Sequence, residues 1–167
     1  MDCPPDGSSL SEAVRQTFND GETIEYRCQR CCKTSENGHA LKKRMLSDVH
    51  TTDFIIVVLK RTRQVRNRLS TRRRAEIITN NVSATENVTL TDILGNEAIF
   101  EPICVMNHIG RMTEDGRSSG HFTADVKNQI TNTWFHTSDS DRPIPIFETD
   151  VTKRGYIILY KKKTQNQ

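Results

Sequence analysis

Apolar positions along the chain fall into short runs separated by polar turns, and most of these runs have the length of strands. The clearest is the unbroken apolar run at 54–59, which is rich in β-branched residues and typical of a strand buried on both faces. We expect this strand, over 53–61, at the centre of a sheet. Further strands are predicted over 26–33, 40–45, 98–107, 120–128, 132–135, 144–147 and 155–161, the later ones in antiparallel succession.

A single helix is predicted near the start of the chain. Ser9 and Glu12 have the spacing of a capping box, in which the hydroxyl and the carboxylate each satisfy a free backbone donor. The polar segments at 82–91 and 111–119 are expected to be loops. The pattern as a whole indicates an α+β fold dominated by antiparallel sheet. The apolar face of the helix recurs every four residues, at Leu10, Val14 and Phe18.

Length and composition change this picture little. At 167 residues, 34% hydrophobic and 27% charged, the chain is one domain's worth and can bury a real core. Its longest apolar run is far too short to cross a bilayer, and no charged-then-apolar leader follows Met1. Five cysteines, an odd number, argue against a disulfide framework. We therefore expect an intracellular protein, of the cytoplasm or nucleus, with no membrane attachment.

The most charged segment, 60–74, is basic and contains no acid. Such a run can bind phosphates through charge alone, or it can form the solvated tip of a hairpin with a return strand at 77–78. It carries no interleaved aromatics for base stacking. A nucleic-acid-binding module therefore stays an alternative, which rests on this one charged segment alone.

Cys28 and Cys31 have the Cys-x-x-Cys spacing that places two sulfurs on one side of a turn, as zinc requires. Zinc needs four ligands, and Cys3, Cys32 and His39 are possible additions. The alternative is a knuckle that holds no metal, or holds it only when a partner segment supplies further ligands.

A histidine motif stands at the head of one predicted strand. Gly120-His121-Phe122-x-Ala124 is preceded by His108-x-Gly110 and followed by Trp134, then Asp139 and Asp141. This set resembles the His box of the ubiquitin-specific proteases, the papain-like cysteine deubiquitinases, with Phe122 in place of the usual tyrosine. The alternative is a strand histidine without a catalytic role.

Other segments resemble the same family in the same order. The segment 155–160 is similar to its closing strand, 59–61 to its Leu-Lys-Arg motif, and Tyr26-x-Cys28-x-x-Cys31 to half of its fingers zinc site. The resemblance covers about 10–160. It implies one partial domain over 1–167, with a fingers portion at about 8–50, a palm at about 51–161, and no thumb subdomain.

The resemblance also implies site residues. His121 would be the general base of a cysteine protease, and His108, Gly110, Gly120 and Phe122 would lie near the channel for ubiquitin's C-terminal tail. A strand-end turn explains His108 and Gly110 equally well. The third member of the triad is expected four positions after Trp134, where Ser138 stands with Asp139 next. Serine cannot hold an imidazolium by charge, whereas Asp139 can.

The nucleophile of the family lies in an Asn-x-Gly-x-x-Cys box, and none of the five cysteines follows that pattern. Cys104 is expected to be a small core residue. We therefore expect a deubiquitinase homologue that is inactive alone. It would be a fragment of a longer enzyme, a truncated pseudoenzyme that binds ubiquitin, a ubiquitinated protein or another partner, or one half of a split enzyme completed by a thumb-like chain. An uncovered palm face predicts self-association or a bound second chain.

Overall fold

The computed structural model describes residues 1–20, 22–27, 34–42, 45–66, 73–112, 118–139 and 141–164. Within these ranges the fold is mostly antiparallel sheet with one short α-helix. No helix in the described ranges is long and apolar enough to cross a membrane. The elements are β1 (Ser8–Ser9), α1 (Leu10–Arg15), the π-helical turn η1 (Gln16–Asp20), β2 (Glu22–Arg27), β3 (Thr34–Lys42), β4 (Phe54–Val58), β5 (Thr62–Arg66), β6 (Arg73–Ile77), β7 (Val82–Ser83), β8 (Val88–Thr91), β9 (Glu97–Met112), β10 (Ser118–Lys127), β11 (Trp134–Ser138), β12 (Ile144–Ile146), the 3₁₀ turn η2 (Glu148–Asp150) and β13 (Gly155–Lys162).

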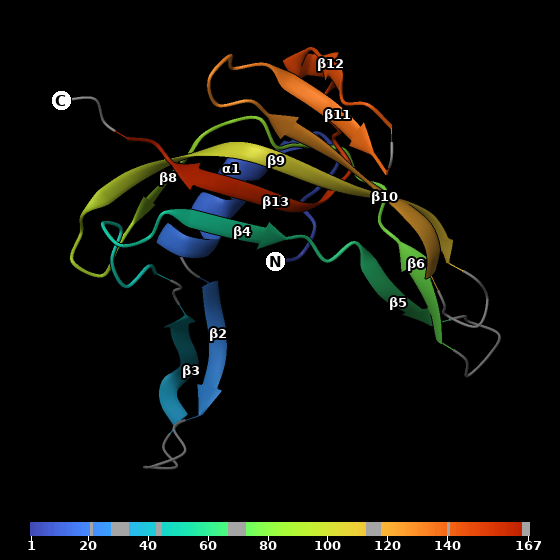
Figure 1. Ribbon diagram of the computed structural model, residues 1–167. Coiled ribbons are helices and arrows are strands. Elements are labelled where there is room, and N and C mark those ends of the chain that lie inside the picture. The colour runs from blue at the N-terminus through green and yellow to red at the C-terminus, as the bar shows by residue number, and fades with distance from the viewer. Residues whose placement is uncertain are drawn as a thin grey trace.

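The main sheet has the strand order β12-β11-β10-β9-β13-β4, and β8 pairs with β9 beside this path. The long strand β9 lies in the middle, and it pairs with β10 over 104–112, with β13 over 100–107 and with β8 over 97–100. Figure 1 shows α1 behind this sheet and the β2–β3 pair extending away from it. The strands predicted over 98–107, 120–128, 132–135, 144–147 and 155–161 correspond to β9 to β13.

One face of the main sheet carries the core. Directly paired residues on neighbouring strands share a face, and Val57, Ile158, Val105 and Asp125 form one such row across β4, β13, β9 and β10. All are buried, and Leu10 and Val14 of α1 belong to the same core cluster as the apolar members of this row. The predicted apolar face of the helix is therefore the face that the core covers.

The position of β4 differs from the prediction. It pairs with β13 only and lies at one end of the main sheet rather than at its centre. Val57 is buried, but Phe54, Ile56 and Val58 are 54%, 66% and 46% exposed. The prediction of a strand buried on both faces was wrong, because an apolar run has the same pattern whether or not its second face is covered.

The predicted capping box at the start of α1 does not form. Ser9 has the extended backbone of an N-cap, but its side chain makes no capping hydrogen bond. Its hydroxyl donates to the Glu86 carboxylate, which also accepts from Ser11 at 2.6 Å. Glu12 instead pairs with Arg15 at 2.9 Å. The Ser9 hydroxyl, which the local spacing assigned to the cap, therefore binds a carboxylate that is distant in the sequence.

Two predicted loops are partly strands. The 82–91 segment contains β7 and β8, whose Val82, Val88 and Leu90 are buried in the core. The 111–119 segment is shortened, because β9 continues to Met112 and β10 begins at Ser118. Residues 113–117 lie outside the described residues.

Two hairpin-like pairs accompany the main sheet. β5 pairs antiparallel with β6, so the basic segment forms part of a strand pair, but its return strand covers 73–77 rather than beginning at 77. Arg63 forms an ion pair with Glu76 at 2.9 Å. Lys60, at the start of this basic segment, lies 3.5 Å from Asp2. The β2–β3 pair covers part of both predicted fingers strands. The cysteine knuckle at 28–33, with Cys28, Cys31 and Cys32, lies outside the described residues.

Candidate functional site

His121 lies on β10, directly opposite Ile109 of β9. The residue before His121 has to be glycine, because β9 approaches β10 closely at this position. A Cβ at Gly120 would overlap the His108 ring and would lie 2.7 Å from the Ile109 carbonyl oxygen. Gly120 and Gly110 face each other in the register of the two strands. The glycines of the predicted motif therefore let β9 and β10 bring His108 close to the backbone beside His121.

The His121 ring meets the two residues that the sequence proposed as its partners. Ser138 Oγ lies 2.6 Å from Nε2, and an Asp139 carboxylate oxygen lies 3.3 Å from Nδ1. Thr123 pairs with Ser138 across β10 and β11, which places the end of β11 beside His121. Asp139 follows β11 with a φ of 40°, a left-handed conformation that aspartate tolerates better than most residues. The structure therefore brings together the three side chains that the sequence analysis named.

This arrangement engages both ring nitrogens of His121. The Asp139 carboxylate can only accept a hydrogen bond, so it favours a proton on Nδ1, and in that tautomer the Ser138 hydroxyl donates to Nε2. A general base needs a free ring nitrogen that faces the proton it removes. The His121 side chain is 41% exposed, so the ring is open to solvent, but a proton taken up at a ring nitrogen has to compete with Ser138 or Asp139.

The two cysteines among the described residues are poor partners for this histidine. Cys104 pairs with Val126 on β10, five positions from His121, which is roughly 17 Å along a strand and on the other face of the sheet. Burial raises the pKa of the Cys104 thiol, and the nearby charge of Asp125 raises it further. Burial also raises the pKa of Cys3. A thiol with a raised pKa forms less of the reactive thiolate at neutral pH.

A pocket of about 310 Å³ lies against Gly120 and Phe122, the residues on either side of His121, whereas His121 itself does not line it. Because side chains alternate along β10, the Phe122 side chain lies on the face of the strand opposite to that of His121. Three of the four residues predicted near a tail channel, His108, Gly120 and Phe122, line it, whereas Gly110 does not. The His108 and Phe122 ring centroids are 4.7 Å apart, and His108 also meets Tyr156 at 6.5 Å. The remaining walls come from segments that the sequence did not assign to the site: Arg61, Thr62, Ile77, Arg154 and Tyr156.

Arg61 is unusual among the residues that line the pocket, because this charged side chain is only 4% exposed. Its guanidinium donates to the backbone carbonyls of Gly155 and Asn80 at 2.7 Å, and to those of Ile78 and Lys153 at 3.3 Å. Burial lowers the pKa of Arg61, and the charge of Arg154 lowers it further. The cation therefore ties together the segments around the start of β13 without a carboxylate partner among the described residues.

A second pair of a histidine and a carboxylate, His136 and Asp125, lies on the same face of β10 and β11 as His121. Asp125 is 2% exposed, and one of its oxygens lies 2.6 Å from Nδ1 of His136, its cross-strand partner. Its other oxygen accepts the Thr152 backbone N–H at 2.7 Å. The sequence analysis missed this pair. The available signal was the alternation of the strands, which places positions 121 and 125, and positions 136 and 138, on one face.

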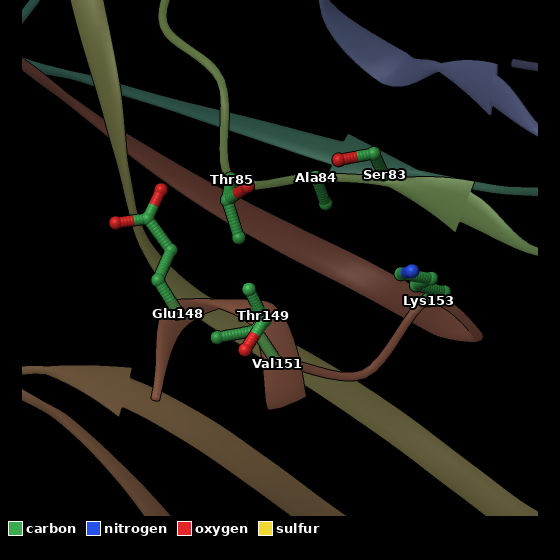
Figure 2. Close-up of a pocket in the computed structure, with 7 residues that line it drawn as sticks. All are labelled: Ser83, Ala84, Thr85, Glu148, Thr149, Val151 and Lys153. Carbon is green, nitrogen blue, oxygen red and sulfur yellow. The ribbon is translucent and has the colours of Figure 1, made fainter. Parts of the chain in front are cut away.

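A second pocket, of about 300 Å³, shares no lining residue with the first (Figure 2). Ala84 and Val151 give it an apolar floor, and Figure 2 shows Glu148 and Lys153 on opposite sides of it. Its remaining groups are the hydroxyls of Ser83, Thr85 and Thr149. These groups do not converge on one point, so we do not take this pocket as the candidate site.

No cluster of three or more potential ligands in the described part of the chain is placed to hold a metal ion. The predicted half-site of Cys28 and Cys31 falls outside that part, so zinc at this position stays a prediction.

The chain is similar to known proteins in sequence and in fold. No family model matches it. It is 29% identical over 147 residues to ubiquitin carboxyl-terminal hydrolase 4 of Pongo abelii, a match that covers 86% of this chain and 14% of that protein. The protein of the same name from Bos taurus is 31% identical over 65 residues, covering 39% of this chain and 6% of the relative. The chain thus spans a small part of the curated relatives that it matches.

Solved structures share the fold. A yeast SAGA DUBm matches 95% of this chain and 34% of its own, with a TM-score of 0.69 at 17% identity. A SAGA Ubp8/Sgf11/Sus1/Sgf73 DUB module bound to ubiquitin aldehyde matches 99% of this chain and 35% of its own, with a TM-score of 0.64 at 19% identity. The chain therefore resembles the ubiquitin-specific proteases and has their fold, and both predictions are confirmed.

Proposed function

We propose that this chain is a deubiquitinase-like module that binds the C-terminal tail of ubiquitin, free or attached to a protein, and does not cleave isopeptide bonds by itself. The observation that carries the proposal is the pocket at Gly120 and Phe122, because residues predicted from the family resemblance converge in its wall. A solved relative of the same fold is described as bound to ubiquitin aldehyde, which supports ubiquitin as the partner.

The pocket has the form that a peptide tail needs. Phe122 is 53% exposed and stacks near His108, so its ring can cover one side of an extended peptide. Gly120 leaves the backbone open beside the His108 ring. Apolar walls with a few convergent polar groups are typical of ligand pockets.

The chemical part of the proposal concerns His121. It would act as the general base toward a thiol supplied from outside the described residues, and Asp139 rather than Ser138 would stabilise the resulting imidazolium through charge. In the arrangement described here, Nε2 is hydrogen-bonded to Ser138 and Nδ1 has a carboxylate oxygen 3.3 Å away, and neither Cys3 nor Cys104 is a suitable nucleophile. The chain alone would therefore bind without cleaving.

The second face of the main sheet supports the expectation of a further partner. Val58, Ile157, Met106 and Ala124 form one row across it, and Ile56, Leu159, Cys104, Val126 and Phe135 form the next. None of these residues is fully buried. An apolar face of this extent usually contacts another protein surface, so we expect a second chain or a second copy to cover it.

The proposal is tested by calorimetric titration of the chain with ubiquitin and with ubiquitin that lacks its last four residues. Binding should weaken at least about tenfold on truncation of ubiquitin and on Phe122→Ala, as expected for a central aromatic contact. Phe147→Ala is the matched control, because Phe147 is 78% exposed and does not line the pocket. Equal binding of both ubiquitin forms, or hydrolysis of a ubiquitin conjugate that His121→Ala abolishes, would contradict the proposal.

A further inference from the structure

The pocket at Gly120 and Phe122 is positively charged. Two arginines, Arg61 and Arg154, line it, and no acidic side chain among the described residues does. The other described walls are aromatic, aliphatic, hydroxyl or backbone, apart from His108. In a partly enclosed site with apolar walls, fixed charges act more strongly than they do in water. The expected ligand therefore carries a negative group.

Arg61 supplies a charge that is fixed in place. A guanidinium has five N–H donors, and the four hydrogen bonds of Arg61 to described residues all end on backbone carbonyls. One donor on Nη2 remains without a partner among the described residues. Carbonyl oxygens orient the guanidinium but leave its net charge uncompensated.

Arg154 supplies the second charge of the pocket. Its side chain is exposed, and it makes no ion pair with any carboxylate in the described ranges. It lines the same pocket as Arg61, so two like charges lie around one cavity and interact unfavourably. An anion between the two arginines would relieve this repulsion.

We propose that the pocket binds the free carboxylate at the end of a protein tail, with Arg154 as the main charged contact and Arg61 as a fixed second donor. A carboxylate presents two coplanar oxygens that match the fork of a guanidinium. Ile77, Phe122 and Tyr156 provide apolar walls for the residues before the carboxylate, which a small inorganic anion would leave unused.

This inference rests on the proposed function, and it makes that function more specific. An isopeptide bond converts the terminal carboxylate of ubiquitin into a neutral amide. The pocket would therefore prefer ubiquitin with a free C-terminus over conjugated ubiquitin, and the chain would act as a receptor for the unattached form.

The test compares three forms of ubiquitin by calorimetry: intact, with its terminal carboxylate converted to an amide, and without its last four residues. Intact ubiquitin should bind roughly tenfold tighter than the amide, the size expected for one charge-assisted contact. Arg154→Gln should bring this ratio close to one. Lys163→Gln is the control, because it removes one charge near the far end of β13, roughly 23 Å along the strand from Tyr156.

Each outcome separates the inference from the function on which it rests. Equal binding of intact ubiquitin and the amide, both tighter than the truncated form, would overturn the carboxylate site and leave tail binding in place. Equal binding of all three forms, or no binding, would overturn both. A preference that survives Arg154→Gln, or that Lys163→Gln also removes, would contradict the assignment of Arg154. Loss of the preference in buffer with millimolar phosphate, with inorganic phosphate itself bound, would show a general anion site and overturn the choice of a carboxylate.

Discussion

Ser138 Oγ lies 2.6 Å from Nε2 of His121, at the position where the family resemblance implies asparagine or aspartate. The geometry of a third triad member is therefore present without its charge. The carboxylate that can supply the charge belongs to the next residue, Asp139, and it lies beside the other ring nitrogen at 3.3 Å. Both ring nitrogens of His121 therefore have a polar neighbour.

The first prediction concerns the proton on His121. In its neutral form the ring should carry this proton on Nδ1, because the Asp139 carboxylate accepts and the Ser138 hydroxyl donates. Ring nitrogen shifts in ¹⁵N-histidine-labelled protein measure this directly. Asp139→Gly suits the positive φ and should let both tautomers appear, while His136, held by Asp125, stays unchanged. A proton on Nε2 of His121 in the unaltered chain would contradict this arrangement.

A second prediction concerns the buried carboxylate of Asp125. Asp125→Asn should lower the free energy of unfolding by about 1–3 kcal/mol. The new amide has only one acceptor oxygen, whereas both oxygens of Asp125 now accept hydrogen bonds, from Thr152 N–H and from His136. The same substitution at Asp139, which is 76% exposed, should change stability by less than about 0.5 kcal/mol. Urea unfolding measures both, and equal effects would refute a structural role for Asp125.

The third prediction tests the packing of α1 on the main sheet. Leu10 is fully buried, so Leu10→Ala should cost about 2–5 kcal/mol of unfolding free energy through lost burial and the cavity that remains. Leu94 is 79% exposed, and Leu94→Ala should be nearly neutral. Thermal or urea unfolding distinguishes the two variants. A neutral Leu10→Ala would mean that α1 does not pack where the structure has it.

Much of the site follows from the sequence because its parts are close in the chain or regularly spaced. The His121 motif and the residues after Trp134 lie on two adjacent antiparallel strands, so their register alone brings Ser138 and Asp139 to the ring. The pocket was harder to foresee. Arg61 and Arg154 come from segments far apart in the sequence, and only the folded sheet places them on one wall.

The errors have a similar cause, since each depends on a contact that a local pattern does not contain. The apolar run of β4 looks the same in an edge strand as in a central one. The hydroxyl of Ser9 is taken by Glu86, which no spacing rule includes. The Asp125–His136 pair lies 11 residues apart, and it depends on the register of β10 and β11.

The exposed face of β4 leads to a fourth prediction. If a second copy covers it, the chain should associate as its concentration rises, and Ile56→Lys should weaken this association by placing a charge on an apolar edge strand. Ile130→Lys is the control, because Ile130 is 95% exposed in the turn after β10. Sedimentation equilibrium measures both. A monomer at every concentration, or an equal effect of the two lysines, would argue against self-association through β4.

The central claim is that ubiquitin binds in the pocket at Gly120 and Phe122. Its most direct test is an NMR titration of the ¹⁵N-labelled chain with unlabelled ubiquitin, followed at the backbone amides of the pocket. The account predicts the largest shifts at Gly120, Phe122 and Tyr156, and their loss when ubiquitin lacks its last four residues. Shifts confined to residues away from the pocket, or no shifts at millimolar ubiquitin, would contradict it.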